Sequence, residues 1–577
     1  MSTMQLGTYL FHRLSQVTKT VFGVPGDFNL NLLEHIYNFD ESQIKWCGNA
    51  NELNAGYAAD GYSRINKFGC FITTYGVGEL SALNAVSGAF AESAPVLHIV
   101  GTSSMLAKKR ACPLNQIHHL IPPKRTYEVP DHKVYERLAE PFSIHTESLT
   151  DENLGKIQDQ IDSVIESIFC HMKPGYLFIP SNLPDIEIPV DLNKQLSFDF
   201  ITKLDINQSA TSEMVSLVLK RIYSSRNPGF VVDQFMKFDL AKLNVFLERS
   251  NFYCYNTTAS RGFVDESLPN FHGVFNNELS TNGTLDILEQ NDFILYLGAN
   301  INESNYFIGG STPLDKKDVI FIGKDYAQVG TNGHIVTGIN CHIFFEELLQ
   351  RINFKTMPKV ETRKCTAFYS DNRIAEDAVK KVSQASLSQV VSKYLRKDDI
   401  IVNEMCSFMF EMPNIRYPKD CKFVGQPFYG SIGYALPATL GVSLAVKDYG
   451  KRGRVILFQG DGSAQMTLQE LASYIRFEID PIIFMLNNSG YSVERVIKGP
   501  TRSYNDIIAD WDWCNILSVF GDRNGNRSVS YKAENLGELN KVLTKLLDYK
   551  DGKIKMIEVI LDEMDVPLRF KTLAGVN

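Results

Sequence analysis

Two polar clusters in the last third of the sequence combine residue types that could bind a metal ion. Gln459-Gly460-Asp461-Gly462-Ser463 follows the apolar run 455–458, and Asn487-Asn488-Ser489-Gly490 follows the apolar run 481–486. Glycines on both sides of Asp461 let the backbone approach a ligand while the carboxylate points at it. Because 24 residues separate Gly462 from Asn487, enough for one helix and one strand, Asp461 and Asn488 are expected at neighbouring strand ends.

The oxygen atoms of these clusters suit a hard cation. The carboxylate of Asp461, the side-chain carbonyl of Asn488 and the backbone carbonyl of Gly490 form an all-oxygen set, which favours Mg²⁺ or Ca²⁺ over zinc. Three protein oxygens leave an octahedral ion about three positions for water or phosphate. Either motif alone is commonly an ordinary turn, but together, on consecutive strands, they predict a metal that holds a diphosphate.

These clusters belong to a chain in which apolar strands alternate with helical patterns in three sets. The alternation predicts an α/β fold of three doubly wound parallel-sheet domains. The expected strands are 21–23, 70–74, 96–100 and 176–180, then 229–232, 293–298 and 319–323, then 400–402, 455–458, 481–486 and 556–561. Less patterned stretches, one polar at about 187–208 and one at about 355–376, place the domains at 1–186, 205–354 and 377–565. A Thr467-x-x-Glu470 capping box is expected to begin the helix after Asp461.

Composition narrows the class of protein. The net charge of −8 over 577 residues, without a long basic run, argues against a nucleic-acid or membrane-surface partner. The N-terminus shows no signal peptide, and no apolar stretch reaches the roughly 18 residues of a membrane span. The ten cysteines lie at least 15 positions apart, which excludes a CxxC site and predicts reduced thiols in a cytoplasmic protein.

The paired motifs resemble the signature of thiamine-diphosphate enzymes, in which GDG is followed about two dozen residues later by NN. The similarity extends to the segments 21–29, 51–62 and 73–84, which resemble the pyruvate-decarboxylase group. Within that group, the stretches 131–135 and 499–506 are similar to the fungal phenylpyruvate, or transaminated amino acid, decarboxylases. The resemblance implies thiamine diphosphate and Mg²⁺ as cofactors and non-oxidative decarboxylation of 2-oxo acids to aldehydes and carbon dioxide.

The resemblance assigns five residues to proton transfer. Glu52 matches the glutamate that hydrogen-bonds the aminopyrimidine ring, and burial beside alanines and Leu53 would raise its pKa. A polar cluster above the thiazolium is implied for Asp27, His118, His119 and Glu494. Adjacent histidines in a strand would face opposite ways, so both can serve only from a loop. Without the resemblance, Glu52 reads as a helix N-terminal glutamate, Asp27 as a helix cap and the histidines as solvated.

Further residues are expected to hold the cofactor. Gly430 would accept a hydrogen bond from the 4′-amino group through its carbonyl, and Ile432 would keep the cofactor bent. The remaining cofactor-binding residues implied are Ser407, Gly460, Asp461, Gly462, Ser463, Asn488, Gly490 and Tyr491, besides Glu52. Relatives carry a glycine at the position of Cys406. A cysteine in its place would not readily adopt a positive φ and would not let the backbone approach the cofactor as closely. The cysteine associated with substrate activation in yeast-type relatives has no counterpart near 231–235, so that form of regulation is not expected.

Substrate choice is inferred from four positions. Tyr429 replaces a tryptophan of pyruvate-specific relatives, and Met405, Met409 and Val493 would line the pocket. Methionines adapt to aromatic groups, so aromatic and long branched 2-oxo acids are favoured, in amino acid catabolism to fusel alcohols, the Ehrlich pathway. The alternatives are a pyruvate decarboxylase, a carboligase that often carries flavin, and a cofactor-binding regulatory protein without turnover.

The family architecture also predicts the assembly. The pyrimidine-binding residues lie in the first domain and the diphosphate-binding residues in the third, and in relatives the two come from different subunits. The chain is therefore expected to form a homodimer with shared active sites, and a homotetramer stays open.

Overall fold

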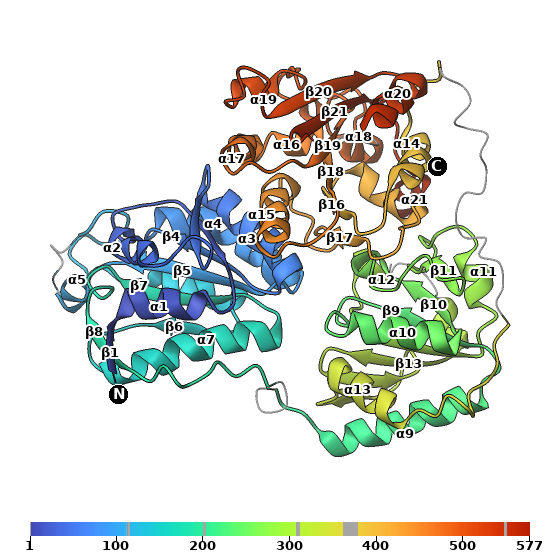
Figure 1. The fold of residues 1–577 in the computed structure, drawn as a ribbon, viewed down its shortest axis with the longest axis horizontal. Helices are drawn as coiled ribbons and strands as arrows, with labels where there is room; N and C mark the ends of the chain where they lie inside the picture. The colour runs from blue at the N-terminus through green and yellow to red at the C-terminus, as the bar shows by residue number, and fades with distance from the viewer. Residues whose placement is uncertain are drawn as a thin grey trace.

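A computed structural model describes residues 2–110, 112, 116–199, 204–306, 312–361, 379–546 and 551–576. Three sheets with helices packed on them form three units, which follow one another along the chain (Figure 1). The predicted α/β fold is confirmed. The predicted domain boundaries stay predictions, and residues 200–203 and 362–378 near them lie outside the described residues.

The first unit is built on a six-stranded parallel sheet. Its order is β3 (Lys45–Gly48), β2 (Thr20–Gly23), β4 (Gly69–Thr73), β5 (Val96–Thr102), β7 (Gly175–Pro180) and β6 (Thr146–Ser148). The helices of this unit are α1 (Leu6–Leu14), α2 (Leu30–Glu34), α3 (Glu52–Asn66), α4 (Val77–Ala91), α5 (Met105–Lys109), α6 (Val134–Ala139) and α7 (Ile157–His171). The central strands are buried on both faces, as expected of a parallel sheet covered by helices.

The third unit repeats the strand order of the first. Its sheet runs β17 (Lys422–Val424), β16 (Ile400–Asn403), β18 (Val455–Gly460), β19 (Ile482–Asn487), β21 (Ile554–Ile560) and β20 (Ser528–Ala533). Its helices are α14 (Gln384–Tyr394), α15 (Ala435–Asp448), α16 (Asp461–Ala464), α17 (Leu471–Arg476), α18 (Ser492–Ile497), α19 (Ile516–Val519), α20 (Leu536–Leu546) and α21 (Leu568–Ala574). In both units the second strand along the chain lies at one edge and the fifth at the other.

The middle unit adds antiparallel strands to a parallel sheet. Its order is β11 (Phe271–Val274), β10 (Tyr253–Asn256), β9 (Pro228–Val232), β12 (Phe293–Ala299), β13 (Asp318–Gly323), β14 (Tyr326–Val329) and β15 (Ile335–Thr337). The strands from β13 to β15 pair antiparallel. Helices α9 (Gln208–Ser224), α10 (Leu240–Ser250), α11 (Thr284–Leu288), α12 (Glu303–Tyr306) and α13 (Cys341–Arg351) belong to this unit. A separate antiparallel ribbon joins β1 (Ser2–Gln5) to β8 (Glu187–Val190), inside the stretch read as polar.

Helices α3 and α15 join the first unit to the third. A Cβ on Gly61 would lie 2.2 Å from the carbonyl oxygen of Ala438, and one on Gly441 would lie 1.9 Å from that of Ala58. The helices therefore touch backbone to backbone, and one cluster of buried apolar side chains continues from the first sheet to the third. Because both sheets share this core, the two units pack as one body, as Figure 1 shows for α3 and α15.

The capping box expected at Thr467 and Glu470 is wrong. The Thr467 hydroxyl donates to the carbonyl of Gly433 at 2.7 Å, and the buried carboxylate of Glu470 accepts from the Asn49 amide at 2.9 Å. The helix begins only after Glu470, as α17, and neither side chain caps it. Thr467 instead bonds to the loop that contains Gly433, and Glu470 bonds to the loop of the first unit that contains Asn49.

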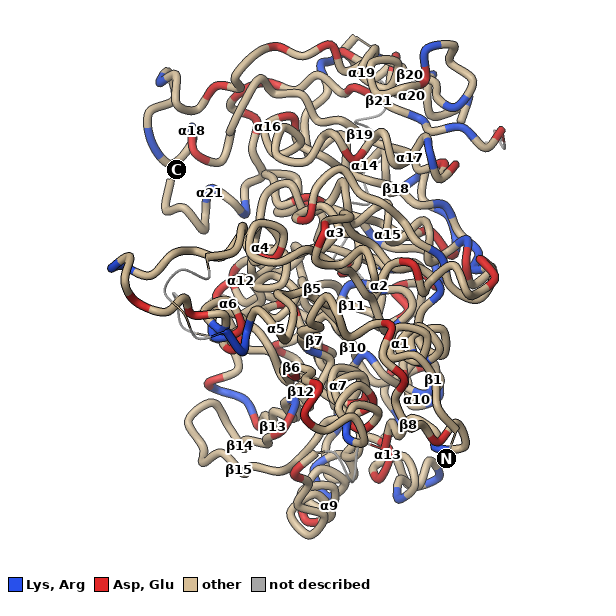
Figure 2. The backbone as a smooth tube through the Cα atoms, turned by 90° about the vertical axis from the view of Figure 1, so that its left-hand side faces the viewer, with Lys and Arg blue, Asp and Glu red and all other residues tan. Residues whose placement is uncertain are grey.

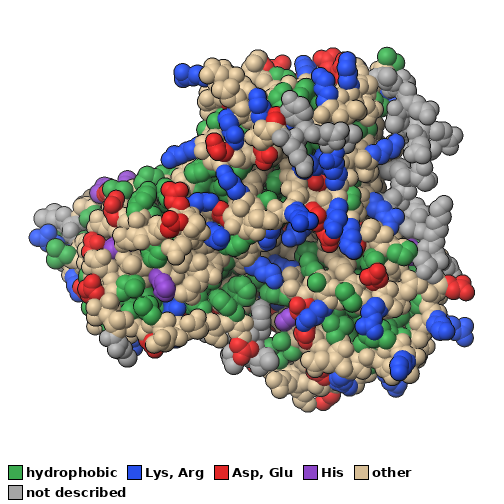
Figure 3. Space-filling model, viewed as in Figure 1, with side chains coloured by type: hydrophobic (Ala, Val, Ile, Leu, Met, Phe, Trp, Pro, Cys, Tyr) green, Lys and Arg blue, Asp and Glu red, His purple; other side chains and the backbone are tan. Residues whose placement is uncertain are grey.

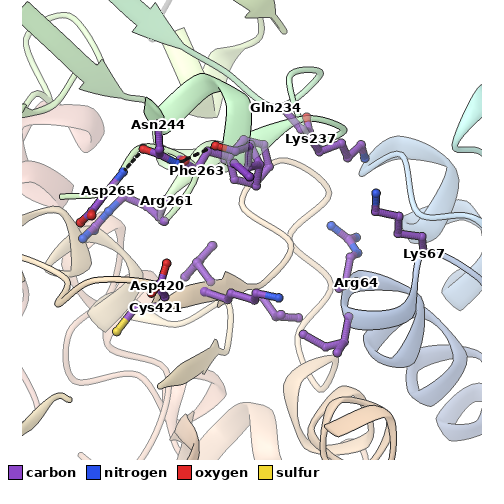
Figure 4. Close-up of a pocket in the computed structure, with 18 of the residues that line it drawn as sticks. Arg64, Lys67, Gln234, Lys237, Asn244, Arg261, Phe263, Asp265, Asp420 and Cys421 are labelled. Atoms are coloured by element: carbon purple, nitrogen blue, oxygen red, sulfur yellow. Dashed lines mark hydrogen bonds between the residues drawn. The ribbon is translucent and has the colours of Figure 1, made fainter. Parts of the chain in front are cut away.

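A large cavity of about 550 Å³ lies where the three units meet. Arg64 and Lys67 of the first unit point toward Lys237 of the middle unit (Figure 4), and basic side chains lie near this junction in Figure 3. Elsewhere basic and acidic residues are interspersed (Figure 2). None of the predicted site residues lines this cavity among the described residues, so it is distinct from the site below.

Two expectations about the chain can be compared with the structure. The nine cysteines that lie in the described residues are free thiols. None of the described helices combines the length and apolar character needed to cross a membrane.

Candidate active site

The ends of two neighbouring parallel strands place Asp461 and Asn488. Strand β18 pairs in parallel with β19, and the register puts Gly460 opposite Leu486. Asp461 follows β18 directly, and Asn488 follows the last residue of β19. Both side chains are more than nine-tenths buried, at the sheet edge where parallel α/β sheets bind ligands. The spacing argument from the sequence therefore placed these two residues correctly.

Three oxygen atoms converge at this edge. The side-chain oxygen of Asn488 lies 2.7 Å from the carbonyl oxygen of Gly490 and 3.1 Å from Oδ1 of Asp461. Turning the amide over would replace these oxygen contacts with two hydrogen bonds. An octahedral Mg²⁺ with ligands at about 2.1 Å keeps neighbouring ligand oxygens about 3 Å apart, so both separations are compatible with this ion.

Burial of Asp461 adds to the case for a cation. Its side chain is buried, and this burial raises its pKa to about 6, against hydrogen bonds from backbone N–H groups that lower it. Oδ1 accepts from Gly462 at 2.8 Å and Oδ2 from Gly490 at 3.1 Å. A divalent cation between these oxygens would favour the ionised carboxylate.

A cavity of about 320 Å³ opens beside these oxygens. Its volume falls in the range of small-molecule and cofactor sites. Met405, Val493 and Glu494 line it, together with every residue predicted to bind the cofactor except Glu52: Ser407, Gly430, Ile432, Gly460, Asp461, Gly462, Ser463, Asn488, Gly490 and Tyr491. The third unit alone supplies all the described residues that line it.

Cys406 fits its loop without strain. Its φ is −139° and its ψ is 177°, an extended conformation open to any residue. The expectation that a cysteine here forfeits a needed positive φ is therefore wrong. Gly460 provides the space, because a Cβ there would lie only 3.2 Å from that of Cys406. Burial raises the pKa of the Cys406 thiol to about 12, so the group stays protonated.

The loop 429–432 presents two of its predicted residues to the cavity. Gly430 has a φ of +66°, which favours glycine, and Ile432 is 38% exposed although apolar. Tyr429 instead turns toward α4, where its hydroxyl donates to Oδ1 of Asn84 at 3.0 Å, and it does not line this cavity. Met409, also assigned to the substrate pocket, does not line this cavity either and is 3% exposed.

The first unit gathers a second set of polar side chains. Nε2 of His118 lies 2.5 Å from Oδ2 of Asp27, and the rings of His118 and His119 are 4.6 Å apart. Phe28, which the sequence did not single out, stacks on His118 at 4.9 Å. Both histidines lie in a loop, as expected, because two adjacent histidines in a strand could not both act at one site. Asp27 does not cap α2, because the N-cap residue there is Asn29.

Glu52 is the first residue of α3, at the carboxyl end of the same sheet. The side chain of the N-cap residue Asn51 accepts from the backbone N–H of Asn54 at 2.8 Å, which leaves the Glu52 carboxylate free of capping. That carboxylate is half-buried and approaches Gly78, where a Cβ would lie 3.2 Å from Oε1. A side chain at position 78 would therefore press on this carboxylate.

Within one chain the two sets of side chains stay apart. Glu494 is exposed on α18, whereas Asp27 precedes α2, and Figure 1 shows these helices on different units well separated. Phe570 of α21 also lines the cavity, and α21 lies next to α18 in Figure 2. No motif marks Phe570 in the sequence, since it reaches the site through a long-range contact.

The chain matches known proteins over nearly its whole length. Three family models match: the N-terminal binding domain of thiamine pyrophosphate enzymes at residues 4–120, the central domain at 215–349 and the C-terminal binding domain at 406–559. The transaminated amino acid decarboxylase of Saccharomyces cerevisiae is 34% identical over 99% of this chain and 95% of its own length. A pyruvate decarboxylase of Candida glabrata is also 34% identical, over 98% of this chain and 97% of its own length.

A solved structure supports the fold independently. The crystal structure of benzoylformate decarboxylase from Polynucleobacter necessarius superposes with a TM-score of 0.75 at 18% identity and covers 98% of this chain. The chain belongs to the thiamine pyrophosphate enzymes. Within that family it is a 2-oxo acid decarboxylase, a carboxy-lyase, and its cofactors are thiamine diphosphate and Mg²⁺.

Proposed function

We propose that this enzyme decarboxylates aromatic and long branched 2-oxo acids to aldehydes, in the breakdown of amino acids. The observation that carries the proposal is a further cavity of about 190 Å³, here called the second cavity. It lies beside the 320 Å³ cavity next to Asp461. Met405 and Phe410 line both cavities and form the partition between them. A cavity of about 150 Å³ is enough to hold a benzene ring, so the second cavity has room for an aromatic side chain.

One part of the walls of this second cavity suits such a side chain, and the rest is polar: Thr258, Asn276, Glu303, Ser304 and Arg569. Apolar residues make up much of its described lining: Leu279, Met405, Met409, Phe410, Pro413, Pro427 and Leu573. Two of them are methionines, whose flexible and polarizable side chains adapt to rings. Pyruvate carries only a methyl group and would leave this space unfilled. The similarity to a transaminated amino acid decarboxylase agrees with the proposal, although pyruvate decarboxylases are equally similar.

The cofactor would be bound at its diphosphate end by the third unit. In this proposal Asp461, Asn488 and Gly490 bind Mg²⁺, and the thiamine diphosphate supplies the nucleophilic carbon and the electron sink. The carbonyl of Gly430 would accept a hydrogen bond from the aminopyrimidine, and Ile432 would pack against the cofactor. If the apolar cavity walls hold the side chain of the substrate, the polar groups near them need only orient its 2-oxo acid group.

Proton transfer is assigned to the other set of residues. Glu52 holds the proton that the pyrimidine ring exchanges. Asp27, His118, His119 and Glu494 would hold and move protons at the reacting end of the cofactor, supplying one for the aldehyde product and removing another. Imidazole titrates in the range these transfers need. Because Asp27 and Glu494 lie far apart in one chain, the complete site would be shared between two chains of a homodimer, which could pair into a tetramer. A cytoplasmic location stays a prediction.

A comparison of substrates tests the proposal. Steady-state rates with phenylpyruvate, indolepyruvate, 4-methyl-2-oxopentanoate and pyruvate would be measured by coupled aldehyde detection. The expected result is a higher kcat/KM for the first three than for pyruvate. Preference for pyruvate would refute the substrate assignment. Silence on every substrate, with cofactor bound, would favour a regulatory protein without turnover.

A further inference from the structure

His119 adopts a backbone conformation that few residues with a side chain take. Its φ is +67°, in the left-handed region. Adjacent residues of an extended segment point to opposite sides, but here the two imidazoles lie 4.6 Å apart, and Phe28 packs against both rings. The left-handed turn therefore brings His118 and His119 to the same side of the loop.

The hydroxyl of Tyr135 holds this turn. It donates to the carbonyl oxygen of His119 at 2.8 Å and accepts from the backbone N–H of Ile121 at 3.0 Å. The residue between them, Leu120, is 6% exposed and packs with Tyr135 and Tyr75 in a small apolar cluster. One buried side chain, itself 3% exposed, thus fixes both peptides that flank Leu120.

Gly76 limits the turn from another direction. A Cβ at this position would lie 2.3 Å from the carbonyl oxygen of His119 and 3.0 Å from the ring of Tyr135. The backbone N–H of Gly76 donates to Oε1 of Glu79 at 2.8 Å, which fixes the glycine itself. The carbonyl of His119 is therefore enclosed between a hydrogen-bond donor and a backbone that leaves no spare space.

We propose that Tyr135 is a positioning residue for the reaction: its hydroxyl holds the His119 carbonyl so that both histidines stay placed for proton transfer beside Asp27. The proposal rests on the proposed function, in which these three side chains move protons. Tyr135 is the second residue of α6, and its hydroxyl bonds to the peptides on both sides of Leu120, so it is argued to act through the histidine loop.

Removing the hydroxyl tests the proposal. Tyr135→Phe should lower kcat by between about tenfold and a hundredfold, the loss that small misplacements of catalytic groups produce. Affinity for thiamine diphosphate with Mg²⁺, measured by fluorescence titration, should stay unchanged. The pH profile of kcat should also shift, because the 2.5 Å contact between His118 and Asp27 depends on the loop.

Tyr75 offers a matched control. It is 1% exposed, its ring lies 5.3 Å from that of Tyr135, and its hydroxyl donates to the carbonyl of His132 at 3.0 Å. Tyr75→Phe removes a buried hydroxyl from the same cluster without touching His119. It should keep the wild-type kcat and pH profile. Gly76→Ala, which pushes on the same carbonyl, should reproduce the Tyr135→Phe effects; because its φ of +60° strains any side chain, urea unfolding must first show that this variant folds.

The outcomes separate this proposal from the function it rests on. Wild-type kcat in both Tyr135→Phe and Gly76→Ala, with His119→Gln impaired, would overturn the positioning role alone. Equal losses in Tyr135→Phe and Tyr75→Phe, with an unchanged pH profile, would show general packing and overturn it too. Full turnover by His119→Gln would overturn the proton-transfer assignment and the positioning role together.

Discussion

At the scale of single residues, the proposed metal site centres on one buried carboxylate, that of Asp461. Asp461 is 1% exposed, and its two oxygens accept from the N–H groups of Gly462 and Gly490. These hydrogen bonds fix the carboxylate but leave it facing the oxygens of Asn488 and Gly490. Oxygen atoms in such close contact repel one another unless a cation or a turned amide separates them. In the proposed metal site, a bound cation would therefore also hold the loop after β19 in place.

Two substitutions should separate binding from turnover. Asp461→Ala removes a proposed metal ligand and should abolish binding of thiamine diphosphate in the presence of Mg²⁺. Glu494→Gln removes an exposed acid near the cavity mouth and should leave that affinity nearly unchanged, while kcat falls by about 10²–10⁴-fold, as for loss of a general acid or base. Calorimetric titration and steady-state kinetics would measure both. Equal behaviour of the two variants would contradict the assigned roles.

Glu79 should make stability depend on pH. Burial raises the pKa of this carboxyl to about 8, from 4.5 in an exposed glutamate, and Glu136 raises it further while the Gly76 N–H lowers it. Between these two pH values the folded chain keeps a proton that the unfolded chain has lost. The stabilisation is therefore complete below about pH 4.5 and is lost as the pH rises toward 8, by up to a few kcal/mol.

The variant Glu79→Gln should remove this dependence. Glutamine is neutral at every pH, and its side-chain oxygen can still accept from Gly76. The variant should gain stability relative to the wild type between pH 5 and pH 8 in urea unfolding at fixed protein concentration. Glu128→Gln, at an exposed glutamate of the same unit, should keep the wild-type pH dependence. Parallel curves for Glu79→Gln and the wild type would rule out the assignment.

At the scale of elements, the sequence predicted the strands that a local run of apolar residues marks. All eleven strands predicted from apolar runs exist. A central parallel strand is buried on both faces, so its sequence is a continuous apolar run that can be recognised. Short or partly exposed strands such as β6, β15 and β20 carry no such run and were missed. Thr467 and Glu470 matched a capping pattern but bond to distant loops. Tyr429 and Phe570 likewise follow tertiary contacts, which spacing does not reveal.

The contact between α3 and α15 can be tested at this scale. Gly441→Ala would place a methyl group 1.9 Å from the carbonyl oxygen of Ala58, so the helices must separate. Overpacking of this kind costs about 1–3 kcal/mol, and the midpoint of urea unfolding should fall accordingly. Gly155→Ala is the control, because its nearest atom would be 3.6 Å away. A stable Gly441→Ala variant would mean that the helices are not held at this distance.

At the scale of the whole molecule, the like topology of the first and third units has a chemical consequence. Each sheet presents functional groups at the carboxyl ends of its strands: Asp27 and Glu52 in one, Asp461 and Asn488 in the other. Helices α3 and α15 join the units with their own backbones in contact, which holds these strand ends in a fixed arrangement. The cavity beside Asp461 receives no described residue from the first unit of its own chain. A second chain, arranged with twofold symmetry, would supply that unit to each cavity.

Mixing two inactive variants tests whether sites are shared. Glu52→Gln damages the first unit and Asp461→Ala the third, so each variant alone should be inactive. In a mixed dimer one site combines both damaged units, but the other combines two intact units. Since half the dimers are mixed at equal concentrations and each has one intact site of two, activity after co-refolding should reach about a quarter of wild type. Sites built within single chains would give none, because every chain then carries a lesion in its own site.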